Sequence, residues 1–266
     1  MVIDFHTHTF PDQMAEKTIA YMEQKGNIKA FIDAKRSTLL RSMSDNGVDM
    51  SVVLPIATKP EQEQTINRLS ERLNGQDDIV YAGAIHPDCA DVEGTLDYIK
   101  SIGLFGIKLH PDYQGIYFDD ERVVELIRQA TRRGLYVITH AGMDVAFPDD
   151  IHCTPDMVLS VLKQLDGVAD NKLILAHMGS YDAPDEVLEK LCGLPVYMDT
   201  AAVLDLHPEK CAAIIKKHGA DKVLFATDSP WFSQRTYIDL LSSMPLSDDE
   251  KEMIFYRNAL DILKLG

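Results

Sequence analysis

Short apolar runs alternate with longer amphipathic segments from one end of the chain to the other. Such an alternation is typical of parallel strands that are joined by crossover helices. The runs are apolar on both faces, as strands buried on both sides should be. Eight of them are predicted strands, at residues 2–6, 50–56, 79–85, 106–110, 136–140, 173–177, 196–199 and 223–227.

The segments between these runs carry helical patterns. In Glu121–Arg133, apolar residues recur near helical spacing and Gly134 follows as a stop. Thr154-Pro155 is a good helix start, because threonine caps a first turn and proline fits its first position. The segment of residues 10–46 is too long for one crossover between strands. We therefore expect it to contain extra helices, packed beside the mouth of the barrel that these strands would form. Two further patterns, at 235–243 and 248–265, follow the last strand.

A chain of 266 residues is long enough for one barrel of eight strands and eight helices. No linker-like or low-complexity tract divides it. We therefore expect residues 1–266 to form a single α/β domain, a (β/α)8 TIM barrel that is distorted by extra helices after the first strand and at the C-terminus. A doubly wound open sheet is the lesser alternative.

The charge balance restricts the partners. The 42 acidic side chains outnumber the 26 basic ones, for a net charge of −16. Because such a surface repels phosphate backbones and anionic membranes, we expect neither nucleic acid nor membrane as a partner. A small anion can still bind where a dication or local bases reverse the field. The four cysteines form no CxxC pair, and no leader or membrane span is evident, so we expect a cytoplasmic protein with reduced thiols.

Polar residues gather at the ends of the predicted strands, where β/α barrels carry their catalytic groups. Seven of the eight strands end in, or are followed by, His or Asp. Burial alone does not explain this, because buried strands favour Val and Ile. The six histidines in these positions are His6, His8, His86, His110, His140 and His177.

Period-two alternation places some of these side chains together. His6 and His8 share one face of an extended strand, so both can reach one ion. Lys108 shares a face with His110 in the same way. Lys108 could pair with a carboxylate, neutralise an anionic substrate, or be carboxylated as a bridge between two metals. The spacing alone leaves these three roles open.

Five motifs together resemble the amidohydrolase superfamily, and within it the amidohydrolase-related branch that includes aminocarboxymuconate semialdehyde decarboxylase. The resemblance covers nearly the whole chain, and Asn258-Ala259 matches the family's ending. The motifs are Asp4–His8, Gly106–Pro111, His140, His177–Gly179 and Thr227–Trp231.

The resemblance implies four ligands for one divalent metal ion: His6, His8, His140 and Asp228. It also implies that His177 acts as a general acid/base beside the metal-bound water. Three imidazoles and a carboxylate suit Zn²⁺ best, while Mn²⁺, Fe²⁺ and Co²⁺ are compatible. A second metal bridged by carboxylated Lys108 is the lesser alternative.

The expected function is that of a metal-dependent hydrolase acting on an amide, lactone or ester of a small molecule. Its metal would activate water, and His177 and Asp228 would handle the proton. The first alternative is a non-oxidative decarboxylase or hydratase of an unsaturated or aromatic carboxylate, held by Lys108, His110 and Trp231. The second is an inert ligand-binding protein on the same fold. A homodimer would be common for such enzymes.

Overall fold

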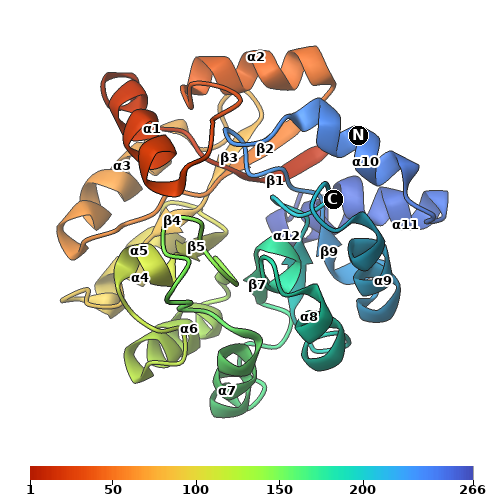
Figure 1. The fold of residues 1–266 in the computed structure, drawn as a ribbon. Coiled ribbons are helices and arrows are strands. Elements are labelled where there is room, and N and C mark those ends of the chain that lie inside the picture. Colours follow the sequence, from red (N-terminus) through yellow and green to blue (C-terminus); the bar gives the residue numbers. More distant parts are fainter. Residues whose placement is uncertain (266) are drawn as a thin grey trace.

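Parallel strands form a ring that helices enclose in the computed structural model, which describes residues 1–265 (Figure 1). Each predicted run contains a strand, and neighbouring strands in the two ladders pair in parallel. The strands are β1 (Ile3–Thr7), β2 (Met50–Val53), β3 (Ile79–Tyr81), β4 (Gly83–Ala84), β5 (Gly106–Leu109), β6 (Tyr136–Thr139), β7 (Leu173–Leu175), β8 (Tyr197–Asp199) and β9 (Val223–Leu224).

Two seams join the ladders β1-β2-β3 and β4 to β9. At one seam, Ala82 alone separates β3 from β4, so these are two halves of one strand. At the other, the Phe5 amide donates to the Phe225 carbonyl at 2.9 Å, and the Asp228 amide donates to the His6 carbonyl at 2.9 Å. The first and last strands are thus hydrogen-bonded, and the fold is the predicted (β/α)8 barrel rather than an open sheet.

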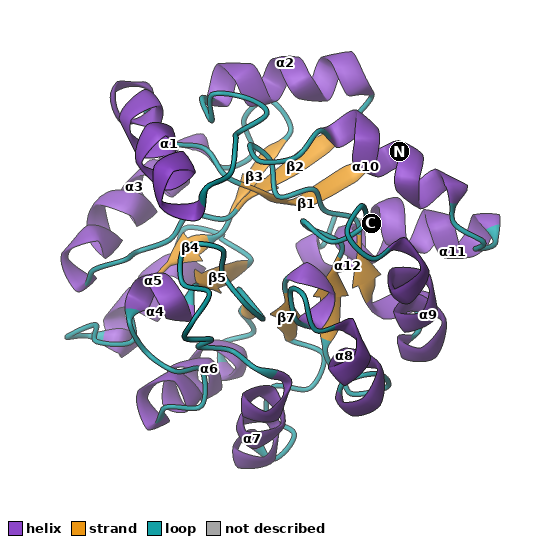
Figure 2. Cartoon of the chain, viewed as in Figure 1, coloured by secondary structure: helices purple, strands orange, loops and turns teal. Residues whose placement is uncertain are grey.

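Helices cover the outside of the strands (Figure 2). The predicted extra helices after the first strand are α1 and α2, and residues of α1 line the barrel mouth. The helical elements are α1 (Asp12–Gly26), α2 (Arg36–Asn46), η1 (Pro60–Gln62), α3 (Glu63–Leu73), α4 (Val92–Ser101), α5 (Pro111–Gln114), α6 (Glu121–Arg132), α7 (Pro155–Leu165), η2 (His177–Gly179), α8 (Pro184–Lys190), α9 (Pro208–His218), η3 (Ala220–Lys222), α10 (Gln234–Ser243), α11 (Asp248–Glu252), η4 (Met253–Arg257) and α12 (Asn258–Leu263).

The predicted helix start at Thr154-Pro155 is confirmed. The Thr154 side chain accepts a hydrogen bond from the Met157 amide and caps α7. The last predicted helix is interrupted by a π-helical turn, η4, between α11 and α12. No helix within residues 1–265 combines the length and the apolar character needed to cross a bilayer.

One apolar cluster occupies the inside of the barrel. Its strand residues come from around the ring, and among the helices only α12 contributes to it. The larger cluster packs the other faces of the strands against the surrounding helices. The fully buried members of the interior cluster are Ile3, Phe5, Val52, Leu54, Ala82, Ile138, Ile174, Leu224, Ala259 and Ile262.

A β-bulge in β1 directs His6 into the barrel. Asp4 pairs with Ser51 and Thr7 with Val53, so three steps on β1 match two on β2. Phe5 belongs to the interior cluster, and the extra residue lets the next side chain, His6, face the interior as well. Without the bulge, His6 would follow Asp4 to the opposite face.

Asp4 ties the closing seam together. Its carboxylate is fully buried and accepts hydrogen bonds from the Thr227 amide at 3.0 Å, the Thr227 hydroxyl at 2.6 Å and the Gln234 side-chain amide at 2.9 Å. These bonds connect β1 to the segment after β9 and to α10.

We predict that Asp4→Ala lowers the free energy of unfolding by about 3 kcal/mol, because it leaves buried donors without an acceptor. Urea unfolding followed by circular dichroism measures the loss. Asp45→Ala, which removes an exposed carboxylate of α2, is the matched control and should stay within about 0.5 kcal/mol of the parent. Equal stability of the two variants would contradict the role of Asp4.

Candidate active site

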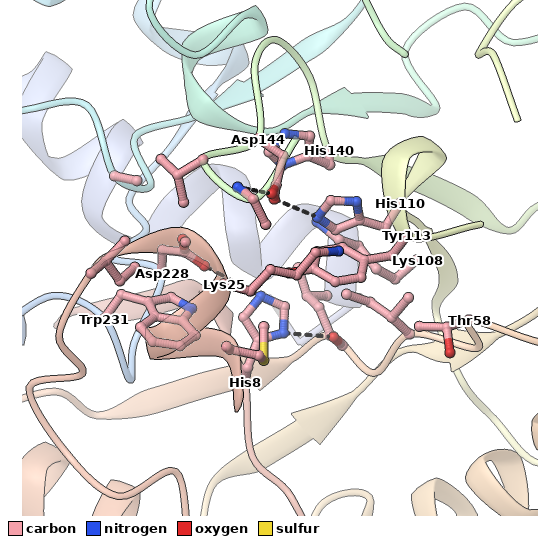
Figure 3. A pocket seen from close by; sticks show the side chains of 18 of the residues that line it. His8, Lys25, Thr58, Lys108, His110, Tyr113, His140, Asp144, Asp228 and Trp231 are labelled. Carbon is pink, nitrogen blue, oxygen red and sulfur yellow. Dashed lines mark hydrogen bonds and ion pairs between the residues drawn. The ribbon is translucent and has the colours of Figure 1, made fainter. Parts of the chain in front are cut away.

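A cavity of about 620 Å³ opens at the C-terminal ends of the strands. The wall also includes residues of α1 and of the loop that follows β6 (Figure 3). We call this cavity the pocket. All eight predicted site residues line it: His6, His8, Lys108, His110, His140, His177, Asp228 and Trp231.

Three of the predicted ligands meet at one point. The Nε2 atoms of His6 and His8 lie 3.1 Å apart. The Asp228 Oδ1 atom lies 3.6 Å from the first and 3.3 Å from the second. His6, His8 and Asp228 are therefore placed so that each offers one atom to a single ion.

The outward nitrogens of these two imidazoles are already used. His6 Nδ1 lies 2.8 Å from Asp199 Oδ2, and His8 Nδ1 lies 2.9 Å from the Leu54 carbonyl. Both partners are acceptors, so each Nδ1 carries the proton and each Nε2 keeps a lone pair. Two lone pairs and a carboxylate oxygen then face one another, and a bound cation would satisfy all three. The donor set fits a divalent metal.

His140 lies beside this group and not within it. Its Nδ1 is 2.9 Å from His177 Nε2, and His177 Nδ1 is 3.0 Å from the Ala201 carbonyl. The structure places His140 with His110 and Asp144 in a second group of potential ligands. The ring of His110 stacks on that of His140, with 4.2 Å between the ring centroids.

A buried carboxylate, Asp112, lies behind both stacked rings. Its Oδ2 is 3.7 Å from His110 Nδ1 and 3.9 Å from His140 Nε2, and these three atoms are buried without a hydrogen-bond partner. A proton on His140 Nε2 would be attracted to this carboxylate, which leaves the lone pair of Nδ1 facing inward beside His177. His140 is thus oriented to act as a ligand if the rings adjust around an ion.

Burial keeps the imidazoles neutral. It lowers the pKa of His6, His110 and His140 well below the usual 6.5, and the nearby charge of Lys108 adds to the effect at His6. Burial would raise the pKa of Asp228, but its interactions with the facing His8 and His6 side chains outweigh burial, so this pKa is lowered from the usual 3.8. Neutral imidazoles and an ionised carboxylate are the forms that bind a metal.

Lys108 faces the same point. Its Nζ atom lies 3.3 Å from His6 Nε2, and the side chain is 1% exposed. Burial lowers its pKa to about 8, against the opposing charges of Asp199 and Asp228. Within residues 1–265 no carboxylate oxygen lies within 4.0 Å of its Nζ atom, so of the three roles that the spacing left open, the pairing with a carboxylate is not formed.

Two of these residues have unusual backbone conformations. His177 has φ +56° and Asp228 has φ +65°, in the left-handed region that residues other than glycine seldom occupy. Such strain is concentrated at functional sites, where the surrounding structure holds it. β7 and β9 end at Leu175 and Leu224, before these two residues and earlier than predicted.

One of the six strand-end histidines lies outside the pocket, and three carboxylates near the site were given no role by the strand-end pattern. His86 is not among the residues that line the pocket, and its Nδ1 accepts from the Asp88 amide at 3.1 Å. Asp199 ends its predicted strand but had no assigned role. Asp112 and Asp144 follow two and four residues after strand-end histidines, and this short spacing was the only available signal.

The family model for amidohydrolases matches residues 3–265. The chain belongs to the amidohydrolase family. This match confirms the resemblance that the strand-end motifs indicated, and with it the expectation of an enzyme of the amidohydrolase type. No significant match was found among curated protein sequences.

Solved structures of similar fold cover 99% of this chain at low identity. One is a 2,6-dihydroxybenzoate decarboxylase from Rhizobium, with 15% identity, a TM-score of 0.73 and 98% of that chain covered. Another is a dihydroxybenzoic acid decarboxylase from Polaromonas sp. JS666 with bound manganese and an inhibitor, with 15% identity, a TM-score of 0.72 and 97% covered. A third is a probable 2-pyrone-4,6-dicarboxylic acid hydrolase from Acinetobacter baumannii, with 15% identity, a TM-score of 0.69 and 99% covered. At this identity the likeness establishes the fold.

We predict that Asp199→Asn weakens zinc binding by about 10- to 100-fold, because an amide directs the His6 ring less firmly than a carboxylate does. Competition against a chelator of known affinity measures the loss. Asp185→Asn, at an exposed carboxylate that pairs with Lys210, is the control and should bind zinc as the parent does. Unchanged affinity in Asp199→Asn would remove Asp199 from the site.

The lowered pKa of Lys108 predicts a pH dependence of stability in the metal-free protein. Between pH 8 and 10.5 the unfolded state holds more protons at this position than the folded state, so the free energy of unfolding rises with pH. The parent should gain about 2 kcal/mol over Lys108→Met between pH 7.5 and 9.5. Urea unfolding in EDTA at both values tests this, and a pH-independent difference would contradict the lowered pKa.

Proposed function

We propose that the protein is a metal-dependent hydrolase that cleaves an amide, lactone or ester of a small molecule. The observation that carries the proposal is the convergence of the His6 and His8 Nε2 lone pairs with the Asp228 carboxylate at the base of the pocket. We propose Zn²⁺ as the ion, since imidazole nitrogens and one carboxylate are its usual ligands. Mn²⁺ is the main alternative, because a decarboxylase of similar fold contains it.

A divalent ion held by His6, His8 and Asp228, with His140 as the further ligand, would polarise a carbonyl group and acidify water. The proton of this water would be transferred by a side chain of the protein, His177. His177 Nδ1 is committed to the Ala201 carbonyl, so Nε2, which lies 2.9 Å from His140 Nδ1, is the nitrogen that would exchange a proton once His140 Nδ1 binds the ion. His177 Nε2 can therefore accept a proton from water and return it to the leaving group.

The pocket suits a small molecule. Its volume of about 620 Å³ lies within the usual range for small-ligand sites. Aromatic side chains on its wall, among them Tyr113, Phe147 and Trp231, can pack against an unsaturated or ring-shaped substrate. The net charge of −16 supports a small molecule over a nucleic acid.

Non-oxidative decarboxylation is the second candidate, and the charges on the pocket wall favour it. Lys25, Lys59 and Lys108 line the pocket of a chain that is acidic as a whole. Together with Trp231, they could hold an unsaturated or aromatic carboxylate. The two reactions differ in their products, because hydrolysis of an ester or lactone releases an acid and decarboxylation releases CO₂.

We predict that His177→Ala lowers turnover by about 10²- to 10⁴-fold, because the proton acceptor is lost. The measurement is turnover of metal-loaded protein on a panel of lactones, esters, amides and aromatic carboxylates, followed by acid release and CO₂ release. His152→Gln is the control, because it removes a histidine that lies outside the pocket wall and contacts Asp150.

Acid release that depends on both the metal and His177 would support hydrolysis. Metal-dependent CO₂ release would select the second candidate. A rate that is unchanged in His177→Ala would refute the assigned role of His177, and turnover of no compound in the panel would favour an inert binding protein.

A further inference from the structure

Lys25 is the cation of the pocket wall that is supplied by the extra helix α1. It lies in the last turn of this helix, and its side chain is half-buried. Its Nζ atom lies 3.5 Å from the centre of the Phe147 ring and 5.2 Å from that of Tyr113. Figure 3 shows the side chain extending into the pocket beside Tyr113 and His110.

The ammonium group has no carboxylate partner. Within residues 1–265, no Asp or Glu oxygen lies within 4.0 Å of Lys25 Nζ, whereas the nearby Lys29 pairs with Glu23 at 2.9 Å. The pocket's own Asp144 is turned elsewhere: its Oδ2 lies 3.5 Å from His110 Nε2, and its Oδ1 accepts from the Ala146 amide at 2.7 Å. A half-buried cation without an anion in so acidic a chain is available to a ligand.

The surroundings hold Lys25 in place. The aromatic faces of Phe147 and Tyr113 attract its ammonium group but cannot replace a hydrogen-bond acceptor. The end of α1 packs closely on the loop after β6, because a Cβ atom on Gly26 would lie 2.9 Å from Val145 Cγ2. Lys25 is therefore positioned before any ligand enters, which lowers the entropic cost of binding.

We propose that Lys25 determines substrate specificity by binding an anionic group, a carboxylate, that is separate from the reacting group. The proposal rests on the proposed function, since it assigns part of the same pocket to the substrate. The metal ligands act on the group that reacts, while Lys25 and the two aromatic rings hold the other end. A substrate with a second acidic group then binds better than one without it.

The chain's single tryptophan, Trp231, lines the pocket and reports binding there by its fluorescence. The probes are benzoate, which has one carboxylate, and isophthalate, which has two on the same ring. Zinc-loaded parent protein should bind isophthalate about tenfold more tightly than benzoate, because of the added charge-assisted hydrogen bond. Lys25→Met should abolish this preference and Lys25→Arg should retain it. Lys29→Met, which removes a cation from the same segment, is the control and should leave the preference unchanged.

Two results would overturn the proposal: no preference for isophthalate in the parent, or a preference that persists in Lys25→Met. A preference that persisted because both affinities fell equally would mean that Lys25 only holds α1 against the loop. The experiment involves no turnover, so it is independent of the His177 assay. A failure of the proposed reaction and a failure of the Lys25 assignment are therefore distinguishable.

Discussion

Three electron pairs that face one another at the base of the pocket dominate the energetics of the site. The outward nitrogens of His6 and His8 are held by Asp199 and the Leu54 carbonyl, so the inward nitrogens keep lone pairs that point at the Asp228 carboxylate. Bringing such acceptors together is unfavourable unless a cation joins them, and the Lys108 ammonium group lies 3.3 Å from only one of the three, His6 Nε2. A bound cation requires neutral imidazoles with protons on the outward nitrogens. The Nδ1 protons of His6 and His8, the lowered histidine pKa values and the proposed chemistry all agree with this requirement.

The barrel supplies the rigidity that this arrangement requires. His6 reaches the interior through the bulge in β1, and Asp228 follows the last strand at the seam where β1 and β9 are joined. Asp4 binds the same seam from the other side through Thr227 and Gln234. The two segments that carry most of the proposed ligands are therefore fixed to each other by backbone and side-chain hydrogen bonds, and the strained backbone of Asp228 is retained.

Hydrophobic alternation and strand-end chemistry were enough to predict the barrel and eight of the side chains on the pocket wall. Because the parallel strands of a barrel all end on one face, histidines that are far apart in the sequence can be predicted to lie together without knowledge of the loops. The features that escaped prediction depend on loop conformation or on register. The bulge that directs His6 has no sequence signal, and Asp112 and Asp144 reach the site through the short helix α5 and the loop after β6. No sequence pattern singles out Lys25, because its aromatic partners Tyr113 and Phe147 come from segments far along the chain.

The metal content of the purified protein decides whether His6, His8 and Asp228 hold an ion. Protein purified without an affinity tag would be analysed by mass spectrometry, beside the double variant His8→Ala, Asp228→Ala. We expect about one transition-metal ion per chain in the parent and its loss in the variant, with the fold retained by circular dichroism. An absence of metal in the parent even after addition of Zn²⁺ or Mn²⁺, or an unchanged content in the double variant, would contradict a metal site at these residues.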